Sequence, residues 1–519
     1  METTLVPVFL RPLARSAACV LGLALSACTT LGPDYSEPQV SWLGAWEQSQ
    51  LHGLREGAGA GGETDLEFWW KRFADPGLNA LLSGAREANP SLRIAGLRIL
   101  ESRARIGIAT SGRYPQVQQA TSAVALVNSH RFGGALPNDS QNLAQYDVGF
   151  GLAWELDFWG RFQRGIESAD AAFFASVAAQ QDLQVLLTAQ VTDLYFAHRT
   201  VERRLEVTRD NINLRERSYE ITRHKFESGD TSELDVQQAR TQLLVTQSTV
   251  PELESNLVQI RNALCAVLGR PPGALPELDT GSASWDAVGG VELTALPAAL
   301  MMRRPDVRAA AWRVAAQSAQ IGIAEAEFYP AVSLLGNLAW SGNSLDATPY
   351  SAAIGVGPSV RWNLFDHGRI RNNVRLQDAL LQQLIEGYQL TVLEAAREID
   401  DAAVQIVKTA ERDRLIKESV AAASRALELA NTRYREGLTN FQRVLDSQRA
   451  LYSQQEQRIV NFGNHISAII SLYKGLGGGW SEATIETLLP AQTRDSMRTR
   501  TDWGDLLDTP PAGSASDLP

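Results

Sequence analysis

The residues best placed for chemistry in this chain lie near its amino terminus. Two arginines precede an apolar stretch, Ala17 to Leu25, which ends in Leu25-Ser26-Ala27-Cys28. Small residues directly before a cysteine are typical of the bacterial lipoprotein cleavage site, at which the cysteine becomes the acylated first residue. The apolar stretch is shorter than the ~20 residues of a membrane-spanning helix, which disfavours an uncleaved anchor. The sequence therefore predicts a signal peptide over residues 1–27 and lipidation at Cys28. Because Thr29 follows rather than aspartate, the usual signal for retention at the inner membrane is absent.

The rest of the sequence shows no pattern for catalysis, a cofactor or a metal site. The six histidines have no ligand spacing, the four methionines do not suggest a soft-metal relay, and no Gly-rich phosphate loop is present. After signal cleavage Cys265 is the only thiol, and its apolar surroundings favour a buried, inert cysteine over a reactive one. His198 is interpreted as a packed interface histidine rather than a ligand. The formal net charge of −11 argues against nucleic acid as a partner. We expect no enzyme.

An alternating strand followed by an eight-residue motif occurs twice in the chain. The motif is Trp154-Glu155-Leu156-Asp157-Phe158-Trp159-Gly160-Arg161 in the first half and Trp362-Asn363-Leu364-Phe365-Asp366-His367-Gly368-Arg369 in the second, 208 residues later (362 minus 154). The same order of motifs repeats on both sides. The offset is too long for a solenoid and indicates a duplicated domain. Each half is predicted to contain a helix, a strand pair, a very long helix, a turn and a helix.

The predicted strands alternate between apolar and small or polar residues. This period-2 pattern is clear at 145–156, 331–340 and 350–364 and weak at 116–127. Strands of about 10 residues with aromatic residues at their ends suit a membrane barrel. A strand of a soluble sandwich would look similar.

The predicted long helices carry a seven-residue apolar ladder. The 68 residues from Arg161 to Ser228 contain no proline and would extend about 100 Å as one helix. The ladder of the first half consists of Val191, His198, Leu205, Ile212, Tyr219 and Phe226, and that of the second half of Ile399, Ile406, Asp413, Val420, Leu427 and Tyr434. This spacing predicts a coiled-coil contact. Taken alone, two antiparallel helices of a soluble bundle would also explain it.

The order of several motifs identifies the chain as similar to the outer-membrane factor family of tripartite efflux pumps, the TolC-like export ducts. The matching motifs are Phe68-Trp69-Trp70, Asp75-Pro76-Gly77-Leu78, Arg303-Arg304-Pro305-Asp306-Val307, Ile321-Gly322-Ile323-Ala324 and Tyr473-Lys474-Gly475-Leu476-Gly477-Gly478-Gly479-Trp480. With the lipoprotein site, they most resemble the acylated members that serve resistance-nodulation-division (RND) pumps.

This resemblance implies a mainly α fold with a transmembrane β part. It implies a homotrimer in which each chain gives four strands to one 12-strand β-barrel, continuous with a periplasmic α-helical barrel. Four strands cannot close a barrel, since the smallest membrane barrels have about 8, so three chains are needed on this count as well. The implied partners are a periplasmic adaptor protein, an inner-membrane RND-type pump and outer-membrane lipid. The implied function is passive conduction of substrates across the periplasm and the outer membrane.

The family closes its periplasmic aperture where the long helices turn. These turns lie at Ser228-Gly229-Asp230-Thr231 and Glu436-Gly437-Leu438-Thr439. By motif position, Asp446 matches a constriction aspartate, while Tyr434 and Asp235 match residues that link neighbouring coiled coils. Arg443 stands where the best-known member has a second aspartate, so the charge of the ring is open. A plain solvated helix face is the alternative for each aspartate.

The expected organisation has six parts, and two other classes of function remain as alternatives. The parts are the signal peptide 1–27, an N-terminal linker 28–67, a first repeat 68–275, an equatorial linker 276–295, a second repeat 296–480 and a partly disordered tail 481–519. A trimeric coiled-coil structural or adhesin-type envelope protein would place its strands at one chain end. An envelope hydrolase would need a nucleophile and a base close together.

Overall fold

The computed structural model describes residues 30–43, 46, 66–130, 140–280, 301–342 and 351–508. The chain forms two compact units, each built from three separate stretches. Unit 1 comprises Met1–Gln39, Ile99–Ser176 and Ala309–Tyr388, and unit 2 comprises Val40–Arg98, Val177–Arg308 and Gln389–Pro519. The signal peptide, Cys28 and most of the two predicted linkers lie outside the described residues.

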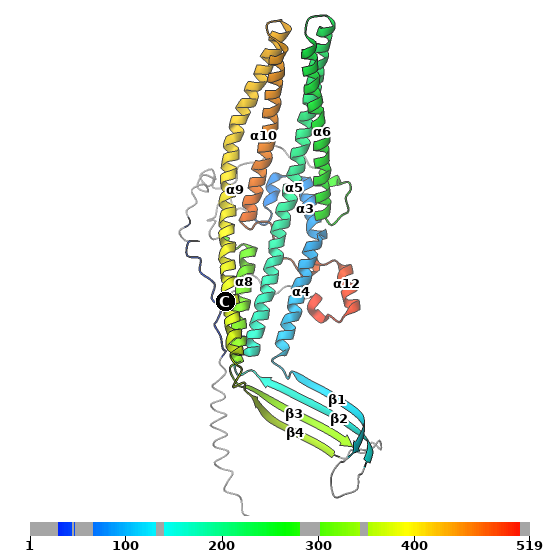
Figure 1. The fold of residues 1–519 in the computed structure, drawn as a ribbon, viewed down its shortest axis with the longest axis vertical. Coiled ribbons are helices and arrows are strands. Elements are labelled where there is room, and N and C mark those ends of the chain that lie inside the picture. The colour runs from blue at the N-terminus through cyan, green and yellow to red at the C-terminus, as the bar shows by residue number, and fades with distance from the viewer. Residues whose placement is uncertain are drawn as a thin grey trace, which may run out of the picture. The chain divides into compact units, whose positions relative to one another are not determined.

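Unit 1 contains one four-stranded antiparallel sheet, whose strands lie side by side in Figure 1. Its strands are β1 (Val117–His130), β2 (Ser140–Leu156), β3 (Ala331–Gly342) and β4 (Ser351–Arg361), in the order β1-β2-β3-β4. β2 and β3 come from different halves of the chain and pair over 11 residues, from Tyr146 opposite Gly342 to Leu156 opposite Val332. The two predicted strand pairs therefore form a single sheet, in which β1 and β4 are the edges.

One face of this sheet is apolar and exposed. Val148 lies opposite Trp340, and Phe150 opposite Leu338, which in turn lies opposite Ile354. Within one chain Ile354 is 79% exposed and Phe150 is 46% exposed. The opposite face carries mostly glycine, serine and other small or polar residues, as period-2 alternation predicts, with Leu335 and Val117 as exposed exceptions. A large exposed apolar sheet face indicates contact with a partner or with lipid.

The strand ends differ from the predictions by a few residues. β1 extends to His130 despite its weak alternation, because its backbone pairs along its whole length with β2. β4 ends at Arg361, three residues earlier than predicted. Trp362 instead donates its indole N–H to Phe328 O at 2.9 Å, as Trp154 does to Arg113 O at 3.2 Å in the first half.

The predicted helical order of both halves is confirmed. The corresponding helices have equal lengths: α4 and α8 have 22 residues each, α5 and α9 have 67, and α6 and α10 have 35. The helices are α3 (Pro76–Ala88), α4 (Pro90–Ser111), α5 (Arg161–Glu227), α6 (Glu233–Val267), α8 (Pro305–Ala326), α9 (Arg369–Arg435), α10 (Phe441–Gly475), α11 (Ile485–Leu488) and α12 (Ala491–Arg500). Short 3-10 helices η2 (Trp69–Phe73), η3 (Pro276–Leu278) and η4 (Gly504–Leu507) join them.

The duplicated eight-residue motif starts the two long helices. Asp157 accepts hydrogen bonds from the backbone N–H groups of Phe162 and Gln163, and Asp366 accepts them from Gly368 and Ile370. These carboxylates satisfy the free N–H groups of a helix start, and the N–H groups hold the pKa of Asp366 below its usual range. Asp157 is the fourth residue of its motif and Asp366 is the fifth, but both carboxylates cap the start of a long helix.

Four of the five family-like motifs lie in unit 2, whereas Ile321-Gly322-Ile323-Ala324 lies in unit 1. The ring of Trp69 stacks on that of Tyr473, with ring centres 4.9 Å apart and planes 2° from parallel. Buried Asp75 caps α3 by accepting from Leu78 N and also accepts from the hydroxyl of Tyr195 on α5 at 2.6 Å. Arg304 binds both carboxylate oxygens of Asp306 and donates to Gly475 O at the end of α10. These motifs therefore hold the helices of unit 2 together.

Two expectations about the helical part need correction. The ladder on α5 is buried at Val191, His198 and Leu205, but Phe226 is 42% exposed, and the buried positions farther along α5 are the polar residues Thr208, Asn211, Arg215 and Thr222. Residues 481–508 are also more ordered than expected, since they form α11, α12 and η4 around buried Ile485, Leu489 and Leu507.

Among the described residues, no helix combines the length and the apolar character that crossing a bilayer would need.

Candidate gate at the helical turns

Both turns between the long helices are closed by a glycine with a left-handed backbone. Gly229 has φ +83° and Gly437 has φ +73°, and a Cβ at either position would meet no atom within 4 Å. Asp230 N bonds to Lys225 O, and Leu438 N bonds to Arg433 O, at 2.7 and 2.9 Å. This is the Schellman arrangement, which satisfies the last carbonyls of a helix. The glycines are therefore needed for their backbone conformation and not for space.

Asp235 lies in the first turn of α6, close to Ser232, whose hydroxyl caps this helix. Its carboxylate accepts from Ser232 Oγ at 3.0 Å and from Thr231 Oγ1 at 2.7 Å, while Ser232 Oγ accepts from Asp235 N. A negative charge here also favours the positive end of the helix dipole. Within one chain, Asp235 thus stabilises its own turn.

Tyr434 joins the two helical hairpins of the chain. It lies in the last turn of α9, packs on Phe441 of α10 with 5.3 Å between ring centres, and has Lys225 Nζ of α5 4.3 Å above its ring. The cluster beneath it draws on all four helices, with Tyr219 from α5, Ala239 from α6, Leu427 from α9 and Val444 from α10 among its members. Tyr434 therefore contacts residues of both hairpins at the turns.

The Tyr434 hydroxyl is buried without a hydrogen-bond partner among the described residues. Burial, and then the charge of Asp235, raise the pKa of this hydroxyl. Thr222 and Thr231 lie nearby, but their hydroxyl protons are donated to Ser218 O at 2.8 Å and to Asp235 Oδ2 at 2.7 Å. They therefore cannot also donate to the Tyr434 hydroxyl, although their oxygens can still accept from it, and both threonines counter the rise in its pKa.

Asp446 and Arg443 are exposed in one chain and do not pair with each other. Asp446 accepts from Gln442 Nε2 at 3.0 Å and forms an ion pair with Arg449 at 3.3 Å. The side chain of Arg443 has no ion pair with any described residue. The structure thus brings Tyr434 close to Asp235, while Asp446 lies one to two turns into α10.

Sequence reasoning missed a buried polar layer between α5 and α10. Thr208 bonds to Tyr452, Ser218 to Gln448, and Arg204 to Glu456. Arg215 is 5% exposed, donates to Gln242 O on α6 and lies over the ring of Tyr452. The signal was available in the spacing, because Thr208, Arg215 and Thr222 recur every seven residues, three positions after Leu205, Ile212 and Tyr219.

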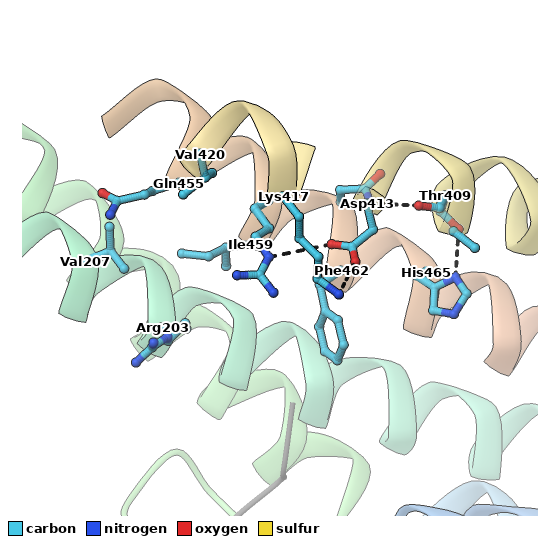
Figure 2. Close-up of a pocket in the computed structure, with 13 residues that line it drawn as sticks. Arg203, Val207, Thr409, Asp413, Lys417, Val420, Gln455, Ile459, Phe462 and His465 are labelled. Atoms are coloured by element: carbon cyan, nitrogen blue, oxygen red, sulfur yellow. Dashed lines mark hydrogen bonds and ion pairs between the residues drawn. The ribbon is translucent and has the colours of Figure 1, made fainter. Parts of the chain in front are cut away.

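A pocket of about 690 Å³ lies between α9, α10 and α5, with its lining shown in Figure 2. Asp413, the charged member of the second ladder, lies 2.9 Å from Lys417 Nζ and 3.7 Å from Arg458 Nε. Thr409 Oγ1 is 2.8 Å from His465 Nδ1, and the threonine proton goes to Gln405 O, so Nδ1 is the donor to Thr409. Burial lowers the pKa of His465, although Asp413 opposes this.

This pocket has no activated nucleophile, because the Thr409 hydroxyl donates to a carbonyl and not to the imidazole. Elsewhere, His198 is buried on α5 with its Nδ1 3.5 Å from Glu202, and Cys265 is a buried free thiol. The described residues contain no group of three or more histidine, cysteine, aspartate or glutamate side chains that could hold a metal ion.

Known proteins match this chain over most of its length. A family model described as "Outer membrane efflux protein" matches residues 81–270 and 296–478. The chain is 28% identical over 469 residues to the cation efflux system protein CusC of Escherichia coli O6:H1, covering 89% of this chain and 98% of that protein. It is 27% identical over 462 residues to the probable outer membrane lipoprotein SilC of Salmonella typhimurium, covering 88% and 97%. The solved structure of the outer-membrane channel OprN superposes with a TM-score of 0.76 at 30% identity, covering 87% of this chain and all of that one.

Proposed function

The chain belongs to the outer membrane efflux protein family, and from this premise we propose how it is assembled, anchored and gated. It is an outer-membrane channel component of tripartite efflux and not an enzyme. The observation that carries this function is the duplicated helix, strand-pair and long-helix order, which the family model matches in both halves. The adhesin alternative would place its strands at one chain end. In planar bilayers, the purified protein should form ion-conducting channels, and folded protein that never conducts would overturn the function.

The proposed assembly is a homotrimer with a 12-strand barrel. The support is the four-stranded sheet, whose edge strands β1 and β4 have no further partner among the described residues. Unpaired backbone groups cost several kcal/mol each in lipid, so the edges must be paired by other copies. The exposed apolar face around Phe150 and Ile354 would face the lipid. A stable, folded monomer in the mass measurement of detergent-solubilised protein would contradict this assembly.

The proposed partners are a periplasmic adaptor and an inner-membrane RND-type pump. Channels of this family work with such partners. This chain would then receive substrate from the pump and adaptor and conduct it passively. Cross-linking in whole cells followed by mass spectrometry should recover both partners on the channel.

The proposed anchor is an acyl modification of Cys28. Support comes from the Leu25-Ser26-Ala27-Cys28 pattern and from SilC, which is named an outer membrane lipoprotein. With Thr29 next, the protein would be lipid-anchored at the outer membrane and extend into the periplasm. The mass of the amino-terminal peptide tests the acylation of Cys28. A mass that shows an unmodified Cys28, or a chain that still contains residues 1–27, would refute this proposal.

The proposed gate consists of Tyr434, Asp235, Asp446 and Arg443. Tyr434 supports it through its contacts with Lys225 and Phe441, which join the two hairpins next to the capped turn of Asp235. Asp446 would face the lumen in the trimer, where three copies create a ring of negative charge that holds cations. Arg443 and Arg449 would reduce this charge.

A further inference from the structure

The pocket of about 690 Å³ in unit 2 lies where the apolar ladder of the second half is interrupted. We call it the seam pocket, and its walls come from α5, α9 and α10 (Figure 2). Asp413 of α9 stands at the ladder position between Ile406 and Val420, where the seven-residue spacing predicts an apolar side chain. Both Asp413 and Val420 line the pocket. The seam pocket therefore coincides with a charged residue at a position suited to an apolar one.

The internal duplication shows what the same positions contain in the other half of the chain. α5 and α6 have the same lengths as α9 and α10 and correspond to them at an offset of 208 residues. The polar lining residues Asp413, Asn461, His465, Thr409 and Arg458 correspond in this way to Leu205, Leu253, Leu257, Val201 and Val250. Leu205 is 7% exposed and Leu253 is 3% exposed, so both pack as core residues. Polar groups at such positions cost free energy unless they are paired, so five of them around one cavity indicate a binding site.

One of these polar residues, Asn461 of α10, has an acceptor that no described residue satisfies. Its side chain is 1% exposed and lines the pocket. Its Nδ2 donates to Thr409 O at 3.0 Å, but its Oδ1 is buried and has no hydrogen-bond partner among the described residues. A buried acceptor without a donor is costly. A ligand that donates a hydrogen bond to Oδ1 would remove this cost.

The charges around the pocket favour an anionic ligand. Asp413 Oδ2 lies 2.9 Å from Lys417 Nζ, and its Oδ1 lies 3.7 Å from Arg458 Nε. Two cations therefore share one carboxylate, and neither has another ion pair with a described residue. On the α5 side, Arg203 pairs with Glu206 of its own helix. One positive charge in this group is thus left without a matching negative charge, which attracts an anion.

The remaining walls suit an apolar body. Val207 of α5 and Ile459 and Phe462 of α10 line the pocket, and we call these three residues the apolar wall. Cavities of about 300–1,000 Å³ with apolar walls and a few polar groups are typical of sites for small organic molecules. The seam pocket has this size and this combination of walls.

We propose that the seam pocket binds an amphipathic organic anion. Its acidic group lies between Lys417 and Arg458, its apolar body packs on the apolar wall, and a hydroxyl or amide group of the ligand donates to Asn461 Oδ1. Because the pocket contacts α5 as well as α9 and α10, a bound ligand joins the two helical hairpins of the chain. This site goes beyond the channel function and does not depend on conduction.

Binding is tested by calorimetric titration of the protein in lipid nanodiscs with naphthalene-1-sulfonate, an amphipathic monoanion, with empty nanodiscs as background. Arg458→Gln and Lys417→Gln should each weaken its affinity by about fivefold or more, because each removes a charge-assisted contact with the sulfonate. Asp413→Asn should tighten the affinity, because the competing carboxylate is lost. Lys408→Gln is the control and should bind like the wild type, since Lys408 pairs with Glu411 and neither lines the pocket.

The sign of the ligand's charge is tested with the naphthalen-1-ylmethylammonium cation, which has the same apolar body and should not bind. Equal affinities for the cation and the anion would overturn the proposal. So would wild-type affinity in both Arg458→Gln and Lys417→Gln, or an absence of saturable binding of the anion below ~1 mM. Lys417 has a half-exposed side chain, so Lys417→Gln remains a usable test if Arg458→Gln does not assemble.

The place of binding is tested by hydrogen exchange with and without naphthalene-1-sulfonate. Exchange should become slower in residues 409–420 of α9 and 455–465 of α10, which line the pocket. It should stay unchanged in residues 247–257 of α6, which correspond to the α10 wall in the first half. Slower exchange at 247–257 and not at 455–465 would overturn the assignment to this pocket. A protein that conducts ions but does not bind the anion would overturn this proposal alone and leave the channel function standing.

Discussion

Asp446 forms its ion pair with Arg449, one turn later on α10, with 3.3 Å between Oδ1 and Nη1. Arg443, which the sequence places one turn before Asp446, makes no ion pair with a described residue. Both partners of the observed pair are about half exposed, so the pair adds little to stability, about 0 to 1 kcal/mol. Its importance for a channel would lie in the charge that it leaves in the lumen.

The two partners of this pair should have opposite effects on ion selectivity. Asp446→Ala should lower the cation preference and change the conductance of single channels, because three negative charges leave the ring. Arg449→Ala should raise the cation preference, because it leaves Asp446 uncompensated. Planar-bilayer recordings measure both. Asp495→Ala removes a similar exposed pair on α12, with Arg498 at 3.2 Å, and should change neither property. If Asp446→Ala and Arg449→Ala leave selectivity unchanged, the constriction lies elsewhere.

Alkaline pH should open the channel through Tyr434. The folded-state pKa of its hydroxyl is raised, so the neutral form contributes fully to stability below the ordinary tyrosine value of about 10. That contribution is lost as the pH rises through the higher folded-state pKa, when a phenolate forms beside Asp235. Open probability should therefore increase above pH ~10. Tyr434→Phe should keep the ring contacts and remove this transition, whereas Tyr434→Ala should raise open probability already at neutral pH. An alkaline transition that persists in Tyr434→Phe would assign it to another group.

Asp235→Ala should weaken the first turn of α6 without unfolding the protein. Loss of a helix cap of this type costs about 1 kcal/mol. Hydrogen exchange of the amides at the start of α6 should become faster, and Ser232→Ala should have the same effect because it removes the capping hydroxyl that Asp235 holds in place. Asp230→Ala, on the same turn, is the control and should leave these amides protected. Unchanged exchange in Asp235→Ala would mean that the Asp235 carboxylate does not contribute to the stability of this capped turn.

Two tyrosine-to-phenylalanine changes should differ sharply in stability. Tyr195→Phe removes a buried hydroxyl that donates to Asp75 and accepts from Arg199, so it should destabilise the protein by about 1–3 kcal/mol. Tyr434→Phe removes a hydroxyl that makes no hydrogen bond of normal geometry with a described residue, and it should be close to neutral at pH 7. Thermal unfolding of the two variants in the same detergent gives the comparison. Equal stabilities would contradict the assigned role of the Tyr195 hydroxyl.

Cys28→Ser should abolish acylation and still leave functional trimers in the outer membrane. Twelve transmembrane strands bind a bilayer far more strongly than acyl chains, which gain only ~0.8 kcal/mol for each buried CH₂ group. Fractionation of envelope membranes and bilayer conductance check this. Recovery of the variant as a soluble periplasmic protein only would show that β1 to β4 do not span the membrane.

The sequence alone predicted those features that depend on neighbouring residues. The duplication predicted two equal halves, and α5 and α9 do both contain 67 residues. Asp157 and Asp366 act within six residues of the N–H groups that they bind, and Gly229 and Gly437 close their own turns. Local hydrogen bonds and backbone preferences decide such features, so a single stretch of sequence contains the information. The lipoprotein pattern at Cys28 is local too, although it stays a prediction.

Only the tertiary structure decided which distant residues meet. The pairing of β2 with β3 joins residues between 176 (Leu156 and Val332) and 196 (Tyr146 and Gly342) positions apart, and no local pattern specifies that choice. The ladder predicted a coiled-coil contact on α5 but not that Thr208 and Arg215 would be buried against α10, because burial depends on the neighbouring helix and not on the apolar character of the residue itself. Arg164 of α5 likewise meets Gly322 of α8 and the backbone of Leu31 only in the folded chain. Periodicity fixes which elements form, whereas the packing of their side chains fixes where they meet.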